Sequence, residues 1–140
     1  MKVIKVKYFN DDCKVERHGD WIDLKAAEDV SLRAGDYTQI PLGVAMKLPA
    51  DYEAHLVPRS STFRKYGIIQ TNGVGIIDND YSGDDDEWAM PVYATRDVMI
   101  RRGARIAQFR IMPTMDDDVI THTVEKLHEL SRGGFGSTGD

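Results

Sequence analysis

The chain has 140 residues, of which 29% are charged, and its formal net charge is -5. This length suits one compact domain with a buried core and excludes a second one. The acidic balance argues against a basic nucleic-acid-binding surface, and no apolar run approaches the roughly 18 residues of a membrane helix. Residues 1–8 alternate where a signal peptide would be continuously apolar, so we expect a cytoplasmic protein.

Apolar residues recur at every second position or in short runs that end at Gly, Pro, Asn or Asp. This pattern is typical of short strands joined by turns, and it predicts an all-β sandwich or jelly roll. In chain order, the predicted strands are residues 4–8, 37–42, 44–48, 53–57, 88–94, 98–100, 106–112 and 119–124. One or two helical turns are expected at residues 62–66, before Gly67.

The two ends of the chain differ in composition. We expect a β domain over residues 1–130, because the Gly- and Ser-rich residues 131–140 lack apolar periodicity and are expected to be flexible. Cys13 is the single cysteine. It therefore excludes an internal disulfide, and a zinc site would lack its usual thiolates.

Residues 75–83 carry the first pattern with chemical meaning. An apolar run enters an Asn/Asp turn and leaves through Tyr81, which predicts a β-hairpin. An aspartate there, with a reference pKa of about 3.9, is ionised at neutral pH and can act as a general base toward water. The alternative is that Asp78 and Asp80 are ordinary turn residues.

Two further segments are suited to phosphate binding. In residues 57–65, a proline is followed by the guanidinium of Arg59 and the hydroxyls of Ser60 and Ser61, groups that can hold phosphate oxygens. The alternative is a solvated basic loop. Ser60 is a poor candidate nucleophile because no histidine stands in the context of an activating base. In residues 132–139 glycine amides and hydroxyls could surround a phosphate; a simple mobile terminus is the alternative.

Taken together, five segments resemble the motifs of the trimeric dUTPase family, in order, along almost the whole chain. They are residues 21–27, 58–61, 75–83, 102–108 and 133–139. The resemblance implies a jelly-roll-like homotrimer whose C-terminal residues 131–140 form a Gly-rich lid on a neighbour's site. It also implies hydrolysis of dUTP to dUMP and pyrophosphate with Mg²⁺, which limits uracil in DNA and supplies dUMP for dTMP synthesis.

The resemblance also assigns roles to matching residues. Asp78 would activate the water that attacks the α-phosphorus, and Tyr81 would pack beneath the deoxyribose and exclude a 2′-hydroxyl. Asp23 would act near Mg²⁺, through water, while the triphosphate holds the ion. The expected substrate contacts are Asn72, Gly75, Ile76 and Ile77 for uracil, Arg59, Ser60, Ser61 and Gln108 for the phosphates, and Arg132, Phe135, Gly136, Ser137 and Thr138 in the lid.

Some positions depart from the family pattern. Trp21 and Ile22 stand where a small residue is usual, and Arg132 lies two positions after the usual motif-five arginine. The acidic residues 84–87 are expected to form a solvated loop, with Trp88 as a further cover for the substrate.

Two rival functions share features with this pattern. A dCTP deaminase resembles the same fold but needs a Glu on the strand after the predicted hairpin, and residues 90–94 contain none. A regulatory protein partner is the other alternative, if the chain is phage-encoded.

Overall fold

The computed structural model describes residues 1–128 and 130–134 of the chain. Its elements are β1 (Lys5–Tyr8), the 3-10 helix η1 (Asp11–Cys13), β2 (Glu16–His18), β3 (Trp21–Lys25), β4 (Val30–Leu32), β5 (Tyr37–Pro41), β6 (Val44–Lys47), β7 (Tyr52–Pro58), α1 (Thr62–Tyr66), β8 (Ile68–Gln70), β9 (Gly75–Ile77), β10 (Ala89–Ala94), β11 (Val98–Ile100) and β12 (Arg105–Pro113). None of the helices in this part of the chain has the length and apolar character needed to cross a membrane.

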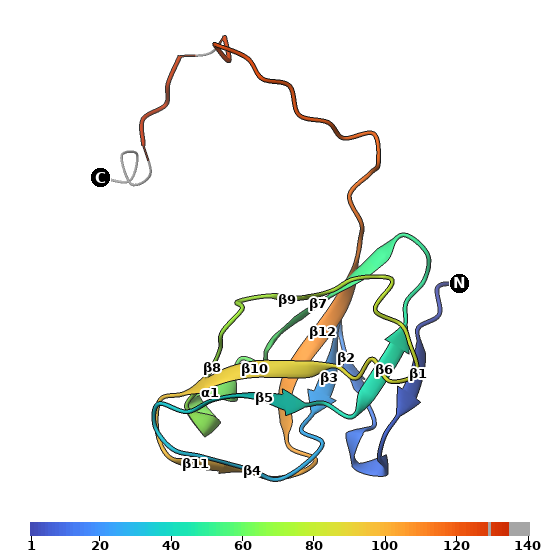
Figure 1. Cartoon of the computed structure of the whole chain (residues 1–140), viewed down its shortest axis with the longest axis vertical. Coiled ribbons are helices and arrows are strands. Elements are labelled where there is room, and N and C mark those ends of the chain that lie inside the picture. Colours follow the sequence, from blue (N-terminus) through green and yellow to red (C-terminus); the bar gives the residue numbers. More distant parts are fainter. Residues whose placement is uncertain (129, 135–140) are drawn as a thin grey trace.

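The strands form a two-layered, jelly-roll-like all-β domain (Figure 1). A five-stranded antiparallel sheet has the order β2-β3-β12-β7-β9, and a three-stranded sheet has the order β5-β10-β8. The pairs β1-β6 and β11-β4 complete the domain. Most neighbours within a sheet are distant in sequence, so residues from motifs far apart in the chain are brought onto adjacent strands.

The hydrophobic core lies between the two main sheets, and the strand periodicity explains its composition. On β12, Ala107 and Phe109 are buried while Gln108 and Arg110 lie on the opposite face, as expected when successive side chains alternate. The Trp88 indole packs edge-to-face on Phe109, with ring centroids 5.0 Å apart. This contact joins the loop before β10 to the middle of the five-stranded sheet.

Most of the predicted elements are confirmed. Strands are present at each predicted segment from residues 4–8 to residues 106–112, within a residue or two of the expected bounds, and α1 has the predicted bounds. Gly67 ends α1 in the left-handed conformation (φ 64°), and its N–H donates to the carbonyl of Phe63 at 2.7 Å. The three-residue strands β2, β4 and β8 and the five-residue β3 were not predicted.

Two predictions were wrong. Residues 75–77 form the strand β9, but β9 pairs with β7, and the residues that follow the Asp78 turn return to β10 without pairing on it. The predicted hairpin is therefore absent from the described chain. Residues 119–124 form no strand, because this segment runs away from the domain (Figure 1) and meets no strand with which to pair.

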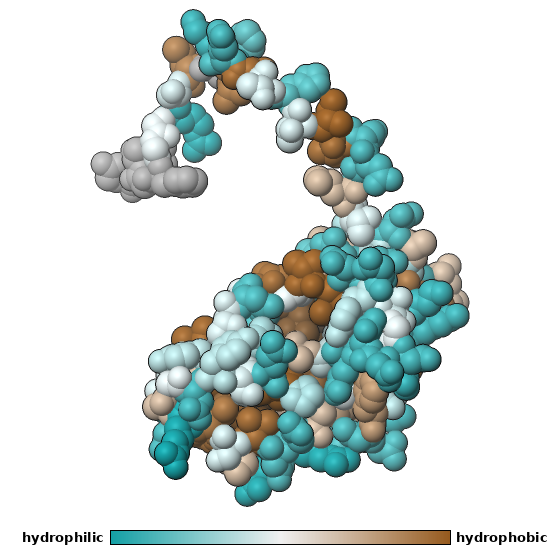
Figure 2. Space-filling view, in the orientation of Figure 1, coloured by the Kyte–Doolittle hydropathy of each residue, from teal (hydrophilic) through white to brown (hydrophobic). Residues whose placement is uncertain are grey.

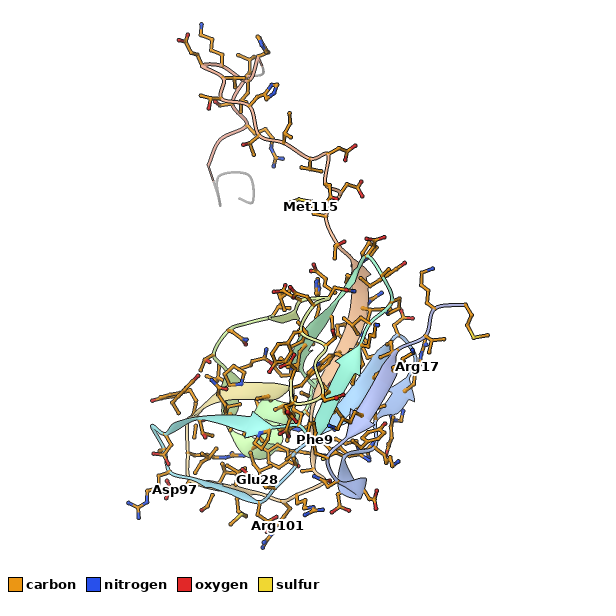
Figure 3. The ribbon with its side chains drawn as sticks, turned by 45° about the vertical axis from the view of Figure 1, so that its right-hand side comes forward. Phe9, Arg17, Glu28, Asp97, Arg101 and Met115 are labelled. Carbon is orange, nitrogen blue, oxygen red and sulfur yellow. The ribbon has the colours of Figure 1, made fainter. Side chains whose placement is uncertain are left out.

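The chain leaves the domain at the end of β12. Thr114 donates its N–H to the Asp51 carbonyl at 2.9 Å, and Met115 lies just beyond this last tie (Figure 3). The extension carries apolar side chains between polar ones (Figure 2). More than half of each is exposed: Met115, Val119, Ile120, Val124, Leu127 and Leu130.

Candidate active site

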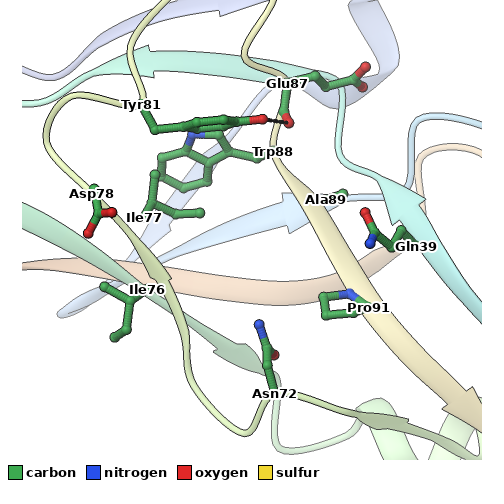
Figure 4. Close-up of a pocket in the computed structure, with 10 residues that line it drawn as sticks. All are labelled: Gln39, Asn72, Ile76, Ile77, Asp78, Tyr81, Glu87, Trp88, Ala89 and Pro91. Carbon is green, nitrogen blue, oxygen red and sulfur yellow. Dashed lines mark hydrogen bonds between the residues drawn. The ribbon is translucent and has the colours of Figure 1, made fainter.

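A cavity of about 330 Å³ opens beside β9, a size in the range of small-ligand sites. Figure 4 shows its walls, formed by the end of β9, the turn that follows, and the start of β10. Its lining residues are Gln39, Asn72, Ile76, Ile77, Asp78, Tyr81, Glu87, Trp88, Ala89 and Pro91. The structure thus brings together most of the residues expected to contact the base and the sugar, together with the expected catalytic aspartate; Gly75, on the same strand, is buried beside them.

The turn that carries Asp78 is held from both sides. The Tyr81 N–H donates to the Asp78 carbonyl at 3.1 Å, and the Asn79 amide donates to the carbonyls of Pro49 and Tyr52, both at 2.8 Å. These bonds leave the Asp78 side chain exposed at the mouth of the cavity. A carboxylate in this position can accept a proton from a water molecule bound in the cavity.

Tyr81 forms one wall of the cavity and is fixed at both ends. Its backbone belongs to the Asp78 turn, and its hydroxyl donates to the Glu87 carbonyl at 3.1 Å (Figure 4). The Trp88 ring lies beneath it, and the buried Trp88 Nε1 has no hydrogen-bond partner among the described residues. The aromatic wall is therefore positioned before any ligand arrives.

A second cluster surrounds Asp23 on the outer face of the five-stranded sheet. Asp23 is 3% exposed. Its carboxylate lies 3.4 Å from Arg59 Nε, 3.6 Å from His18 Nε2 and 3.7 Å from Arg105 Nη1. Its Oδ2 atom is buried without a hydrogen bond in the described chain. The cluster combines a carboxylate with several cations, a setting suited to phosphates and their counter-ion.

Neighbouring residues set the shape of this cluster. Gln108 faces Asp23 across β3 and β12, and its amide donates to the Pro58 carbonyl at 3.1 Å. The hydrogen bond and the charge of Lys25, whose Nζ lies 2.8 Å from Glu16 Oε1, lower the pKa of Glu16. Glu16 therefore stays ionised and also attracts Arg105, at 3.5 Å.

The Arg59 loop is tied to the same strand ends. The Arg59 N–H donates to the Thr62 hydroxyl at 2.9 Å, and that hydroxyl donates to the Ile106 carbonyl at 2.9 Å. Ser60 is exposed and Ser61 half-buried. The two serines thus follow Arg59 in the loop that brings its guanidinium to Asp23, and the structure shows no side-chain hydrogen bond among the described residues that assigns them a role.

One chain does not gather all the expected residues in one place. Asp23 faces Gln108, Gln108 faces Val57, and Ile77 faces Ala54. At about 4.8 Å per strand and about 3.3 Å per residue, the Asp23 cluster and Asp78 are separated by about 14 Å across the sheet and about 13 Å along it. Within one chain, the residues expected to contact the base and sugar are therefore remote from those expected to contact the phosphates.

Of the expected lid residues, Arg132 is described, and it is exposed in the extension beyond the domain. Phe135, Gly136, Ser137 and Thr138 lie outside the described residues. Within the described ranges, no three side chains of His, Cys, Asp or Glu come together as a metal site.

Sequence reasoning missed several contributors. Gln39 and Pro91 face each other across β5 and β10, and this strand pairing is invisible in a single sequence. His18 and Arg105 reach Asp23 from β2 and β12, two strands that β3 joins. Alternation could have indicated His18, which shares a face with Glu16, had β2 been recognised.

The sequence is similar to that of known dUTPases over nearly its whole length. A family model described as dUTPase matches residues 12–139. The SPbeta prophage-derived deoxyuridine 5'-triphosphate nucleotidohydrolase YosS of Bacillus subtilis (strain 168) is 52% identical over 141 residues, which cover 97% of this chain and 97% of that protein.

Solved structures show the same similarity. The dUTPase of Streptococcus mutans matches with a TM-score of 0.73 and 27% identity, over 83% of this chain and 98% of that one. The dUTPase of Staphylococcus bacteriophage 80alpha, solved with dUPNHPP, matches with a TM-score of 0.72 and 25% identity, over 99% of each chain. The family model and the Bacillus relative each span nearly the whole sequence, so the chain belongs to the dUTPase family, the deoxyuridine 5'-triphosphate nucleotidohydrolases.

Proposed function

We propose that this dUTPase hydrolyses dUTP to dUMP and pyrophosphate by an in-line attack of water on the α-phosphorus, with Asp78 as the general base. The observation that carries the proposal is the exposed Asp78 carboxylate at the mouth of a preformed cavity. As the water oxygen bonds to phosphorus, Asp78 accepts its proton and the bond to the pyrophosphate oxygen breaks.

The cavity beside β9 holds the nucleoside. Asn72 and the backbone of residues 75–77 hydrogen-bond the edge of uracil, whose donors and acceptors follow an order that cytosine does not share. The Tyr81 ring packs beneath the deoxyribose, where a 2′-hydroxyl would collide with it. Groups left unpaired by the wrong base, together with this steric contact, give discrimination.

The Asp23 cluster of a neighbouring chain binds the triphosphate. Arg59, Ser60, Ser61 and Gln108 contact phosphate oxygens. Asp23 would hold Mg²⁺ through water, as the reluctance of Mg²⁺ to dehydrate favours, and the ion would neutralise part of the charge of the triphosphate. The buried Oδ2 of Asp23, which has no hydrogen bond within the described chain, can accept one from such a water.

The complete site requires a homotrimer. The separation of the two groups within one chain, and the exposed apolar side chains of the extension, both favour sites shared between neighbours. The extension crosses to an adjacent subunit, where Phe135 covers uracil, Arg132 reaches the γ-phosphate, and Gly136, Ser137 and Thr138 close around the phosphates.

In the cell, this activity limits uracil in DNA and supplies dUMP for dTMP synthesis, and its nucleotide substrate is consistent with a cytoplasmic location. Pyrophosphate release is measured with dUTP, dCTP, UTP and dTTP, each with and without Mg²⁺. We expect turnover of dUTP alone, stimulated by Mg²⁺. Equal turnover of dCTP or UTP would overturn the assignment of the cavity.

A regulatory partner is a second proposal for the same chain. The bacteriophage 80alpha structure is described as showing that phage dUTPases control transfer of virulence genes by a proto-oncogenic G protein-like mechanism. In this chain the exposed Asp84 and Asp85 are the candidate contacts, because Asp86 and Glu87 accept hydrogen bonds from the chain's own Gly83 and Gly43 N–H groups. Loss of partner capture in an Asp84→Ala/Asp85→Ala variant with normal dUTP turnover would support it.

A further inference from the structure

Gln70, at the end of β8, contacts the base cavity only through another side chain. It is 6% exposed and does not line the cavity. Its Nε2 donates to the Leu56 carbonyl at 3.0 Å and to Asn72 Oδ1 at 2.8 Å. Gln70 therefore links the backbone of β7 to the side chain that faces the base.

These two bonds fix the direction of both amides. A main-chain carbonyl only accepts, so the Gln70 atom that faces Leu56 must be the NH₂ group. The same NH₂ group faces Asn72, and two NH₂ groups cannot bond each other, so Asn72 must turn its oxygen toward Gln70. The Asn72 nitrogen then points into the cavity, as Figure 4 shows.

Gln70 keeps this orientation although its own side-chain oxygen makes no hydrogen bond among the described residues. This Oε1 atom is also buried, which makes the missing bond unfavourable. Rotating the amide would bring Oε1 against the Leu56 oxygen and the Asn72 oxygen, which is worse. Gly75 lies beside the pair, because a Cβ added there would stand 3.4 Å from both amide nitrogens, in van der Waals contact.

We propose that Gln70 is a positioning residue for base specificity: it makes Asn72 present an N–H donor, which selects the 4-keto oxygen of uracil against the 4-amino group of cytosine. The inference rests on the proposed function, in which Asn72 contacts the base. A rotated Asn72 would present an acceptor, and it would favour cytosine instead. The choice between uracil and cytosine therefore depends on Gln70, which does not itself line the cavity.

The test compares Gln70→Met with Ile68→Met. Ile68 is buried on the same face of β8 and has no role in orienting Asn72, so its variant controls for altered packing. In Gln70→Met the Asn72 amide can rotate, and we expect the ratio of kcat/KM for dUTP to that for dCTP to fall about tenfold or more. The affinities for dUMP and dCMP should converge in the same way, and Ile68→Met should keep the wild-type ratio.

Two outcomes separate failure of this inference from failure of the proposed function. If Asn72→Ala lowers the dUTP to dCTP ratio but Gln70→Met does not, Asn72 contacts the base and Gln70 has no part in its orientation. If Asn72→Ala leaves the ratio unchanged, the base does not bind at Asn72 and the proposed base site itself is wrong. Gln70→Glu gives an independent check, because its carboxylate attracts the Asn72 NH₂ group and should lower the ratio further than Met does.

Discussion

Asp78 and Asp23 show how the same side chain acquires different chemistry from its surroundings. Asp23 is buried among Arg59, Arg105 and His18, so neighbouring side chains already balance its negative charge. Asp78 is exposed at the cavity mouth, and no ion pair engages it within the described chain. This difference in surroundings is why we propose Asp78, and not Asp23, as the general base.

The first prediction concerns Asp78→Asn. The amide keeps the shape of the side chain but cannot accept the proton of the attacking water, so kcat for dUTP should fall about 100-fold or more. The dissociation constant for dUTP and the melting temperature should stay near their wild-type values. A kcat within a few-fold of wild type would remove Asp78 from the mechanism.

The second prediction concerns Tyr81, the proposed barrier to ribose. In Tyr81→Ala the ring is lost, and kcat/KM for UTP should rise relative to that for dUTP. Tyr81→Phe is the matched control, because it keeps the ring and removes only the hydroxyl bond to the Glu87 carbonyl; it should retain most of the discrimination. If Tyr81→Ala keeps the wild-type ratio, ribose is excluded elsewhere.

At the scale of the elements, the sequence predicted strands well where alternation ran for four residues or more, as in β5, β7 and β12. The three-residue strands β2, β4 and β8 hold too little of the period to be recognised, whereas the equally short β11 was predicted from its apolar run. β3 was missed because Trp21, Ile22 and Leu24 interrupt its alternation. The predicted hairpin at residues 75–83 was wrong because a turn sequence shows where a strand ends but does not show which strand it pairs with; β9 pairs with β7.

The site residues were likewise predictable only where a sequence motif carries them. The family resemblance identified Asn72, Asp78 and Tyr81, which lie together in the cavity. It could not indicate Gln39 or Gln70, whose positions depend on which strands are neighbours. The separation of Asp23 from Asp78 also required strand order, because Asp23 lies on β3 and Asp78 directly follows β9, with β12 and β7 between these two strands.

The third prediction tests the packing of the β5–β6 turn on η1. Gly43 has φ 71°, and a Cβ there would overlap Cys13 Sγ, which is buried and whose pKa burial raises. Gly43→Ala combines a left-handed alanine with this overlap, and it should lower the free energy of unfolding by roughly 2–4 kcal/mol in urea titrations at fixed protein concentration.

Gly19→Ala is the control for Gly43→Ala. Gly19 has a similar φ of 62°, but a methyl group added there would meet no atom within 4 Å, so only the backbone cost of roughly 1 kcal/mol should remain. Adding Cys13→Ala to Gly43→Ala should recover part of the loss. Equal destabilisation by the two glycine substitutions would show that the overlap with Cys13 is relieved without cost.

For the whole molecule, two features of one chain favour an oligomer: the Asp23 cluster lies far from the cavity that Asp78 borders, and the extension exposes apolar side chains. The extension exposes 72% of Ile120 and 81% of Leu127, side chains that a soluble protein normally buries against a partner. Rotational symmetry satisfies all these surfaces at once, since each chain then gives its extension to one neighbour and receives one from the other. Light scattering should show a trimer, the ring that the family resemblance implies.

The fourth prediction uses this symmetry to test whether sites are shared. Asp78→Asn chains and chains that lack residues 131–140 should each be nearly inactive. In a shared site, the base and the lid come from different chains, so an exchanged one-to-one mixture should regain about a quarter of wild-type turnover, because about one site in four combines an intact Asp78 with an intact lid. Subunit exchange is followed with chains that carry two different tags.

As a control, Asp78→Asn chains mixed with chains that carry both defects should stay inactive, since no Asp78 carboxylate is present. Inactivity of the first mixture after demonstrated exchange would mean that Asp78 and the lid of one chain serve the same site, and that the extension folds back instead of crossing to a neighbour.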